Sequence, residues 1–235
     1  MPEPALLNVS NLQAWYGESH VLHGVTFDVR KGEVVTLIGR NGAGKTTTLR
    51  SLIGVVRKRA GSGTFKGVDL LKVAPHKVAR LGIGYVPEER GIFSKLNVIE
   101  NLLFPPAWQS GGMSVNEIYS LFPNLKGRDN TPGTRLSGGE QQMLAIGRIL
   151  RTGADFILLD EPTEGIAPVI IEEIGAALRI LKDRGMTIIL VEQNLRFAAS
   201  VADRHFVLDQ GKVVDEIANH ALDANMDRLN RYLGV

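Results

Sequence analysis

The sequence predicts an α/β fold with a mainly parallel sheet, an antiparallel β region at its N-terminal end and an inserted helical subdomain. In the last third, two uninterrupted runs of apolar residues flank a helical segment, which is typical of a β-α-β unit whose strands pair in parallel. The first third holds short strand-like runs separated by turn residues. Between residues 88 and 153 strand signals disappear. We therefore expect one domain over residues 1–235, with a helical subdomain over 88–153 inserted within it.

Length and composition fit a globular domain. The 235 residues are 44% hydrophobic and 22% charged, which is enough apolar mass for a core. With 27 basic and 25 acidic residues the net charge is +2, so we expect no nucleic-acid partner. The absence of cysteine from the sequence excludes disulfides, thiolate metal sites and cysteine nucleophiles. We expect neither a signal peptide nor a membrane-spanning helix, because no run approaches the ~20 apolar residues a span needs.

The first third of the chain predicts strands over Leu6–Val9, Val21–Val29, Val34–Ile38, Thr64–Val68 and Ile83–Val86. Turn-like residues 31–33 indicate a hairpin between the second and third strands. A helix is expected over Gly44–Ile53, and a short one over Pro75–Leu81. Residues 61–63, Gly-Ser-Gly, are expected to interrupt regular secondary structure before the fourth strand.

The rest of the chain predicts helices over Val98–Phe104, Val115–Leu121, Glu140–Arg151 and Val169–Asp183. Buried strands are expected over Phe156–Leu159 and Thr187–Val191. The runs Phe206–Leu208 and Lys212–Asp215 flank Asp-Gln-Gly and indicate a hairpin. The tail from Asn219 is predicted to be helical.

A glycine-rich turn links a predicted strand to a predicted helix. Residues 39–46 read G-R-N-G-A-G-K-T, which matches the phosphate-binding pattern G-x-x-x-x-G-K-[ST]. Glycines let backbone N–H groups wrap around phosphate, and the helix N-terminus adds a favourable dipole. Lys45 is predicted to reach the β- and γ-phosphates, and the Thr46 hydroxyl to bind Mg²⁺. The expected nucleotide-binding residues here are Gly39, Arg40, Asn41, Gly42, Ala43, Gly44, Lys45, Thr46 and Thr47. The motif predicts a P-loop NTPase core; a ligand-free glycine turn is the alternative.

Two acids end the buried strand at residues 156–159. Asp160 follows the strand where a parallel sheet places the Mg²⁺-holding acid of such enzymes. Glu161 is positioned to polarise the water that attacks the γ-phosphate. Strand alternation would direct the two carboxylates to different sides. The alternative is that they serve only as first-turn acids before Pro162.

A second candidate phosphate site precedes the helix at residues 140–151. Ser137, Gly138 and Gly139 combine a hydroxyl, glycine amides and a helix N-terminus, all of which can donate to an anion. One chain thus carries two phosphate-binding devices for one nucleotide motif. We favour a head-to-tail dimer. In it, each nucleotide lies between the phosphate loop of one subunit and the Ser-Gly-Gly turn of the other. The alternative is a plain serine N-cap.

Together these motifs resemble the ATP-binding subunit of ABC transporters, whose signature is matched by L-S-G-G-E-Q at residues 136–141. The resemblance runs from Leu6 to about Val214. It implies ATP and Mg²⁺ as cofactors, ATP hydrolysis, membrane-spanning permease subunits, a second ATPase subunit and, indirectly, a solute-binding protein. It also implies a place on the cytoplasmic face of the plasma membrane. Tyr16 corresponds to the aromatic that stacks on adenine, unless it is a core tyrosine. Residues 164–167 correspond to the loop that contacts the opposite subunit.

Two positions depart from the family pattern. Glu88 stands where most members have a glutamine that touches Mg²⁺ and senses the permease. Gln193 stands where most have a histidine that contacts the γ-phosphate, and none of the five histidines replaces it by position. An amide can donate a hydrogen bond but cannot titrate. We expect Lys45, Glu161 and Gln193 to be catalytic and Thr46, Glu88 and Asp160 to hold metal; loss of sensing at Gln193 is the alternative.

The finer pattern resembles the smaller ATPase subunit of branched-chain amino-acid importers. It consists of V-P-E at 86–88, V-E-Q-N at 191–194, E-P-T-E-G-I-A-P at 161–168 and the ending R-Y-L-G-V. Related importers for urea and short amides share much of it. Three other readings are a kinase or GTPase, a non-transport cassette ATPase, and a nucleotide-gated binding module without turnover. Residues 88–93 are expected to serve as hinge and coupling contact with the permease.

Overall fold

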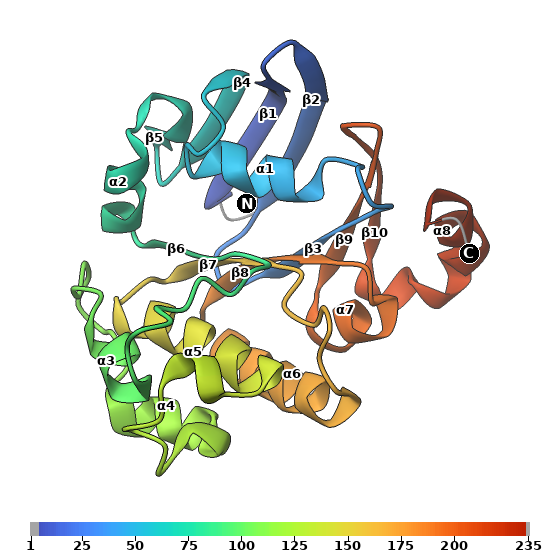
Figure 1. The fold of residues 1–235 in the computed structure, drawn as a ribbon. Helices are drawn as coiled ribbons and strands as arrows, with labels where there is room; N and C mark the ends of the chain where they lie inside the picture. The colour runs from blue at the N-terminus through green and yellow to red at the C-terminus, as the bar shows by residue number, and fades with distance from the viewer. Residues whose placement is uncertain (1–4, 234–235) are drawn as a thin grey trace.

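The computed structural model describes residues 5–233, which fold into two β-sheets and a group of helices (Figure 1). The strands are β1 (Leu7–Tyr16), β2 (Ser19–Val29), β3 (Val34–Ile38), β4 (Lys58–Phe65), β5 (Val68–Asp69), β6 (Ile83–Val86), β7 (Phe156–Asp160), β8 (Thr187–Glu192), β9 (Arg204–Asp209) and β10 (Lys212–Ala218). The helices are α1 (Lys45–Leu52), α2 (Pro75–Val78), α3 (Val98–Leu103), α4 (Val115–Leu121), α5 (Gly138–Arg151), α6 (Pro168–Asp183), α7 (Leu195–Val201) and α8 (Met226–Leu233).

The central sheet has six strands in the order β10-β9-β3-β8-β7-β6. All neighbouring pairs are parallel except β9 and β10, so the predicted mainly parallel sheet is confirmed. Every residue of β3, β7 and β8 is buried, which explains their uninterrupted apolar runs. Because these strands are parallel, their carboxyl ends meet at one edge, where ligands bind in such sheets.

Two hydrophobic cores lie on opposite faces of the central sheet. On one face, α1 is packed between the central sheet and a four-stranded antiparallel sheet of order β2-β1-β4-β5 (Figure 1). On the other face, α5, α6 and α7 cover the sheet, and α3 and α4 pack against α5. The predicted antiparallel region at the N-terminal end is therefore confirmed as a layer of its own.

The hairpin predicted between the second and third strands is wrong. β2 pairs with β1 in the antiparallel sheet, whereas β3 lies between β8 and β9 in the central sheet. The turn-like residues 31–33 form a crossover between the sheets. Gly32 donates its N–H to the Thr187 hydroxyl at 2.9 Å, and Glu33 pairs with Arg204 at 2.6 Å. These contacts from distant sequence hold the crossover.

The interruption of regular structure expected at residues 61–63 is also wrong, because these residues lie within strand β4. A Cβ at Gly61 would lie 2.2 Å from the Asn11 carbonyl oxygen of the neighbouring strand. Glycine permits this close approach beside a register shift in β1, where Asn11 has a φ of 49°. The shift interrupts the alternation of β1, which is longer than the predicted run Leu6–Val9. The predicted strand Thr64–Val68 is divided in two by a turn at Lys66 and Gly67, both with positive φ.

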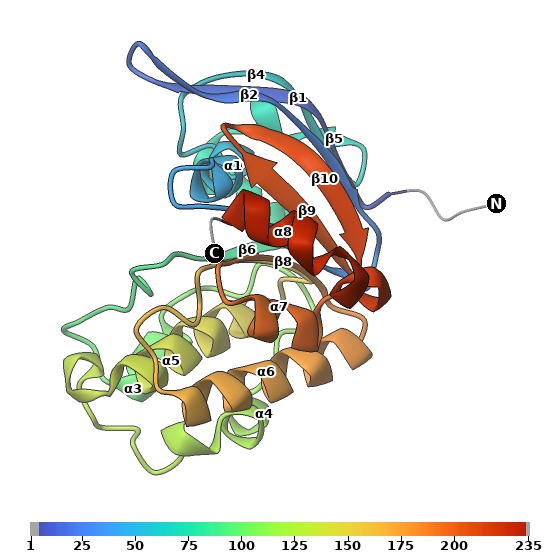
Figure 2. The same ribbon diagram turned by 90° about the vertical axis from the view of Figure 1, so that its right-hand side faces the viewer.

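The C-terminal part follows the predicted order. β9 and β10 form the expected hairpin, and its turn residues Gln210 and Gly211 have φ values of 46° and 74°. Beyond β10, two short turns lead into α8, which packs beside β9 in a small cluster of its own (Figure 2). Gly234 and Val235, part of the quoted ending, lie outside the described residues.

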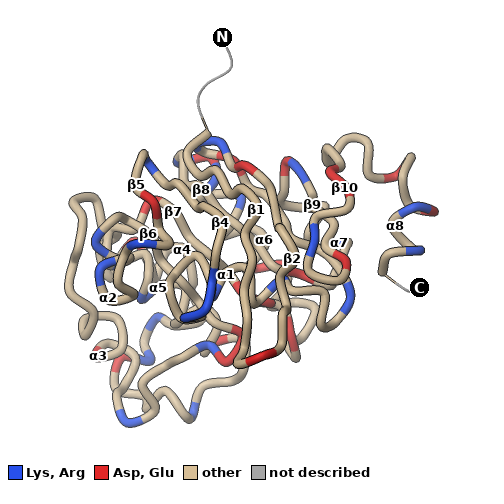
Figure 3. Tube along the Cα trace, turned by 90° about the horizontal axis from the view of Figure 1, so that it is seen from above, with Lys and Arg blue, Asp and Glu red and all other residues tan. Residues whose placement is uncertain are grey.

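Charge and helix length add two general observations. Basic and acidic residues are interspersed over the fold (Figure 3). Among the helices of residues 5–233, none combines the length and the apolar character needed to cross a membrane.

Candidate nucleotide site

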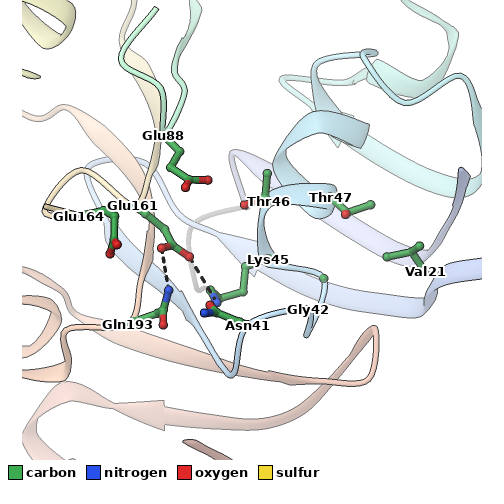
Figure 4. A pocket seen from close by; sticks show the side chains of 11 residues that line it. Val21, Asn41, Gly42, Lys45, Thr46, Thr47, Glu88, Glu161, Glu164 and Gln193 are labelled. Carbon is green, nitrogen blue, oxygen red and sulfur yellow. Dashed lines mark hydrogen bonds and ion pairs between the residues drawn. The ribbon is translucent and has the colours of Figure 1, made fainter.

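A cavity of about 370 Å³ opens at the carboxyl ends of β3, β7 and β8 (Figure 4). Its lining residues are Val21, Asn41, Gly42, Gly44, Lys45, Thr46, Thr47, Glu88, Glu161, Glu164 and Gln193. Gly39 and Arg40 line an adjoining cavity together with Asn41, Gln193 and residues of α8. Ala43, in the middle of the loop, is buried. The structure thus brings the predicted phosphate loop together with both predicted catalytic partners, Glu161 and Gln193.

The loop backbone depends on glycine at two positions. Gly39 has a φ of 156°, and a Cβ there would lie 2.3 Å from the Leu208 carbonyl oxygen of β9. Gly44 has a φ of 105° and precedes α1 without any side-chain cap. The first N–H groups of α1 are therefore left for an anion. Both glycines are required for backbone reasons, independent of any ligand.

Lys45 lies across the loop. Its side chain is only 4% exposed, and Nζ donates to the carbonyl oxygens of Gly39 at 2.9 Å and Arg40 at 3.2 Å. The same nitrogen is 3.5 Å from Oε1 of Glu161. The ammonium is therefore fixed between the loop and the end of β7, within the cavity (Figure 4).

Asp160 connects the loop helix to the sheet. It is fully buried; Oδ1 accepts a hydrogen bond from the Thr46 hydroxyl at 2.8 Å, and Oδ2 one from the Tyr85 hydroxyl at 2.9 Å. Burial raises the pKa of Asp160, and the two hydrogen bonds oppose that rise. Sequence reasoning missed Tyr85, because its contact with Asp160 depends on the pairing of β6 with β7.

Glu161 and Gln193 are in direct contact. Nε2 of Gln193 donates to Oε2 of Glu161 at 2.7 Å, while Oε1 of Glu161 faces Lys45 (Figure 4). The side chain of Glu161 is 12% exposed and lines the cavity. A cavity-lining carboxylate held in this way can accept a proton from a water molecule.

Three glutamates, Glu88, Glu161 and Glu164, line the cavity together with Lys45. Burial raises the pKa of Glu88, and the charges of Glu161 and Asp160 raise it further. Hard carboxylate and hydroxyl oxygens suit Mg²⁺, which needs few protein ligands when phosphates supply the rest. Within residues 5–233, no cluster of three or more His, Asp or Glu side chains could hold a metal by itself. Thr46 and Asp160 fit a magnesium ion that is also bound by nucleotide phosphate.

The L-S-G-G-E-Q segment lies apart from this cavity. Ser137 caps α5 in a capping box: its N–H donates to Glu140 at 2.8 Å and its hydroxyl accepts from the Glu140 N–H at 3.3 Å. A Cβ at Gly139 would lie 2.4 Å from Ile170 of α6, so this glycine allows the two helices to approach closely. None of Ser137, Gly138 and Gly139 lines the cavity.

Tyr16 ends β1, is 47% exposed and does not line the cavity either. It is not a core residue. Its predicted contact with adenine stays a prediction, as does the phosphate contact of the L-S-G-G-E-Q segment.

Comparison with known proteins identifies the family. Residues 22–164, more than half of the chain, match the family model described as "ABC transporter". The chain belongs to the ABC transporter family. It is an ABC ATPase, as the resemblance of its motifs predicted.

Two curated relatives of this ABC ATPase are informative. It is 40% identical over 232 residues to the high-affinity branched-chain amino acid transport ATP-binding protein BraG of Pseudomonas aeruginosa, covering 97% of this chain and 100% of that protein. It is 34% identical over 218 residues to the lipopolysaccharide export system ATP-binding protein LptB of Haemophilus influenzae, covering 89% of each.

Solved structures support the fold of the ABC ATPase. One ATP-binding cassette of an ABC transporter superposes with a TM-score of 0.81 at 25% identity, covering 98% of this chain and 100% of that one. A dimeric cassette in a post-hydrolysis state bound to ADP and Pi superposes with a TM-score of 0.78 at 24% identity, covering 91% and 98%. The predicted P-loop NTPase fold is confirmed.

Proposed function

We propose that this chain is an ATP-hydrolysing subunit of an importer for branched-chain amino acids. The observation that carries the proposal is the 40% identity to BraG over nearly the full length of both chains. The identity to LptB, an export protein, is lower and covers less of each chain. The segments V-P-E and V-E-Q-N point to the same subfamily.

The contacts in the cavity support a hydrolytic mechanism. Lys45 and the loop N–H groups bind the phosphates, and Thr46, Asp160 and Glu88 would hold Mg²⁺, which would neutralise phosphate charge. The attacking water forms a bond to the γ-phosphorus while the bond to the β–γ bridging oxygen breaks, giving ADP and phosphate. Glu161 accepts the proton of that water, and Gln193 orients Glu161 and donates to the γ-phosphate.

A head-to-tail dimer would complete each site. The N-terminus of α5 lies outside the cavity, where Ser137 is exposed and Gly138 half-buried, so these two residues of the segment 137–139 are open to a nucleotide bound by another subunit; Gly139 itself is buried. The second subunit is another ABC ATPase, identical to this one or different. Tyr16 is the proposed adenine platform, and its exposed ring is open to stacking.

An apolar surface supports contact with a permease. Four exposed apolar side chains lie within residues 88–109, namely Phe93, Leu103, Phe104 and Trp108. The rings of Phe93 and Phe104 pack edge to face, with their centroids 4.7 Å apart. Trp108 also lines a largely apolar cavity of about 310 Å³ with residues of β6, α2 and α5. Permease docking here would hold the chain at the cytoplasmic face of the membrane, with a solute-binding protein acting on the other side.

Arg148 of α5 links this surface to the segment proposed as hinge. Its Nη2 donates to the Gly91 carbonyl at 2.8 Å, and its guanidinium lies 4.8 Å from the centre of the Phe93 ring. Movement of α5 on dimer closure would therefore reach residues 88–93 and the permease.

Solute-dependent ATPase activity tests the proposal. The chain is reconstituted with its permease, partner ATPase and binding protein, and phosphate release is measured with leucine, isoleucine or valine and separately with urea or acetamide. We expect stimulation by the branched-chain amino acids. Stimulation by urea or acetamide alone would assign the related amide importers instead, and stimulation by none of them would overturn the proposal.

A further inference from the structure

A buried carboxylate joins the two loops that carry Glu161 and Gln193. Glu192, the last residue of β8, is 2% exposed. Its Oε1 accepts hydrogen bonds from the Thr163 N–H at 3.2 Å and from the Thr163 hydroxyl at 2.8 Å. Its Oε2 accepts from the N–H groups of Gln193 at 3.2 Å and Asn194 at 3.1 Å. Each oxygen therefore holds one of the two loops.

The four donors fill the acceptor capacity of an ionised carboxylate. Thr163 lies two residues after Glu161, and Gln193 directly follows Glu192. Asn194 is also the N-cap of α7, accepting from the Phe197 N–H at 3.1 Å. One side chain thus sets the spacing between the loop after β7 and the loop after β8.

Glu192 acts without touching the cavity. Glu192 is not among the cavity-lining residues, whereas Glu161 and Gln193 are. A hydrogen bond of 2.7 Å joins the side chains of Glu161 and Gln193. We propose that Glu192 is a positioning residue for ATP hydrolysis, holding Glu161 and Gln193 in mutual register through Thr163 and the backbone of Gln193 and Asn194. This inference rests on the proposed roles of Glu161 and Gln193.

The chemistry of the site favours a positioning role over simple space filling. Burial raises the pKa of Glu192 to about 7, against the hydrogen bonds of Thr163, Asn194 and Gln193, which lower it. A carboxylate is therefore kept in a place where its charge is disfavoured. An apolar residue could fill the volume, but it could not bind donors from both loops.

Glu192→Gln tests the inference in the full chain. The amide keeps the shape but replaces one acceptor oxygen with an NH₂ group, which faces N–H donors or the Thr163 hydroxyl. We expect ATP affinity within about twofold of wild type and kcat lower by about tenfold or more, because misplacement near 1 Å is costly at a reacting centre. Glu192→Asp keeps the charge and should recover part of the lost kcat.

Glu33→Gln is the matched control. Glu33 is also a buried carboxylate, paired with Arg204, but it precedes β3 at the end opposite the phosphate loop. Its loss should lower the thermal midpoint and leave kcat of the folded protein within about twofold. If Glu192→Gln does not fold, Thr163→Val removes the 2.8 Å bond and should lower kcat at unchanged ATP affinity.

A pH profile separates positioning from general loss of structure. Ionisation of Glu192 should raise wild-type kcat as pH rises through about 7, and Glu192→Gln should lack that inflection. Other charged groups on neighbouring elements include Asp160 at the end of β7, Glu161 directly after it, Lys45 and Arg50 of α1 and Arg196 of α7, and both proteins share them.

The outcomes are distinct. A kcat of Glu192→Gln within about twofold of wild type, or an equal loss in Glu33→Gln, overturns the inference. Glu161→Gln and Gln193→Ala are measured in parallel. If these two variants keep wild-type turnover, the proposed function of the site fails; if they lose turnover while Glu192→Gln keeps it, only the positioning role fails.

Discussion

At the scale of single residues, the site depends on one unusual backbone conformation. Glu161 has a φ of 46°, which is uncommon for a residue with a side chain and costs on the order of 1 kcal/mol. This turn directs Glu161 toward Lys45 and Gln193, while Asp160, still in β7, faces Thr46 and Tyr85. Strand alternation alone predicted the separation of the two acids, but Glu161 lies outside the strand and the turn directs its side chain.

Lys45→Ala should abolish turnover. Among the described residues that line the cavity, the substitution removes the one cation, and it leaves the Glu161 carboxylate without its neighbour at 3.5 Å. We expect phosphate release to fall by about a hundredfold or more, consistent with loss of electrostatic stabilisation worth about 3 kcal/mol. Lys31→Ala, at the exposed crossover, is the control and should be unaffected. Normal release by Lys45→Ala would contradict the phosphate-loop assignment.

Stability should depend on pH through Glu192. The folded pKa of about 7 lies above the ordinary value of 4.5, so between these values the folded state holds a proton that the unfolded state has released. This group's contribution is thus fully present below pH 4.5 and is lost as pH rises through about 7. Denaturant unfolding of wild type relative to Glu192→Gln should show a loss on the order of 2 kcal/mol from pH 5.5 to 8. A difference that is constant or grows with pH would contradict this.

At the scale of elements, local patterns were sufficient where one segment decides the structure. The phosphate loop, the buried strands β7 and β8 and the β9–β10 hairpin are each encoded by adjacent residues. The pairing of strands is not encoded by adjacent residues. The crossover at residues 31–33, for example, is held by contacts with Thr187 and Arg204, far along the chain. For the same reason the linear motifs found Lys45 and Glu161 but missed Tyr85, Arg148 and Glu192, whose contacts cross between elements.

Arg148→Ala should uncouple hydrolysis from transport. The guanidinium connects α5 to Gly91 and Phe93, neither of which lines the nucleotide cavity. In the reconstituted complex we expect basal ATPase activity to change by less than about threefold, while stimulation by solute is largely lost. Arg184→Ala, exposed at the end of α6, is the control. Full stimulation in Arg148→Ala would exclude this link.

At the scale of the whole molecule, the two predicted phosphate-binding segments lie in separate places. The cavity is built at the end of the central sheet, and the N-terminus of α5 does not line it. In the proposed head-to-tail dimer, hydrolysis would be a property of the assembly, because each subunit would complete the other's site.

Cysteine cross-linking should detect the head-to-tail arrangement, because the chain has no cysteine of its own. A chain with Asn41→Cys and Ser137→Cys in a Glu161→Gln background should form ATP-dependent cross-links between subunits. The two single-cysteine chains serve as controls. Cross-links within one chain, or none with ATP, would contradict the proposed dimer.

ATP-driven uptake of labelled leucine tests the central claim most directly. The reconstituted transporter, with this chain as one ATPase subunit, is placed in vesicles with ATP on the side of the ATPase subunits, and leucine accumulation on that side is measured for wild type and Glu161→Gln. We predict accumulation by wild type and none above background by Glu161→Gln. Undiminished accumulation by Glu161→Gln, or no leucine uptake by wild type in a complex that hydrolyses ATP, would contradict the account.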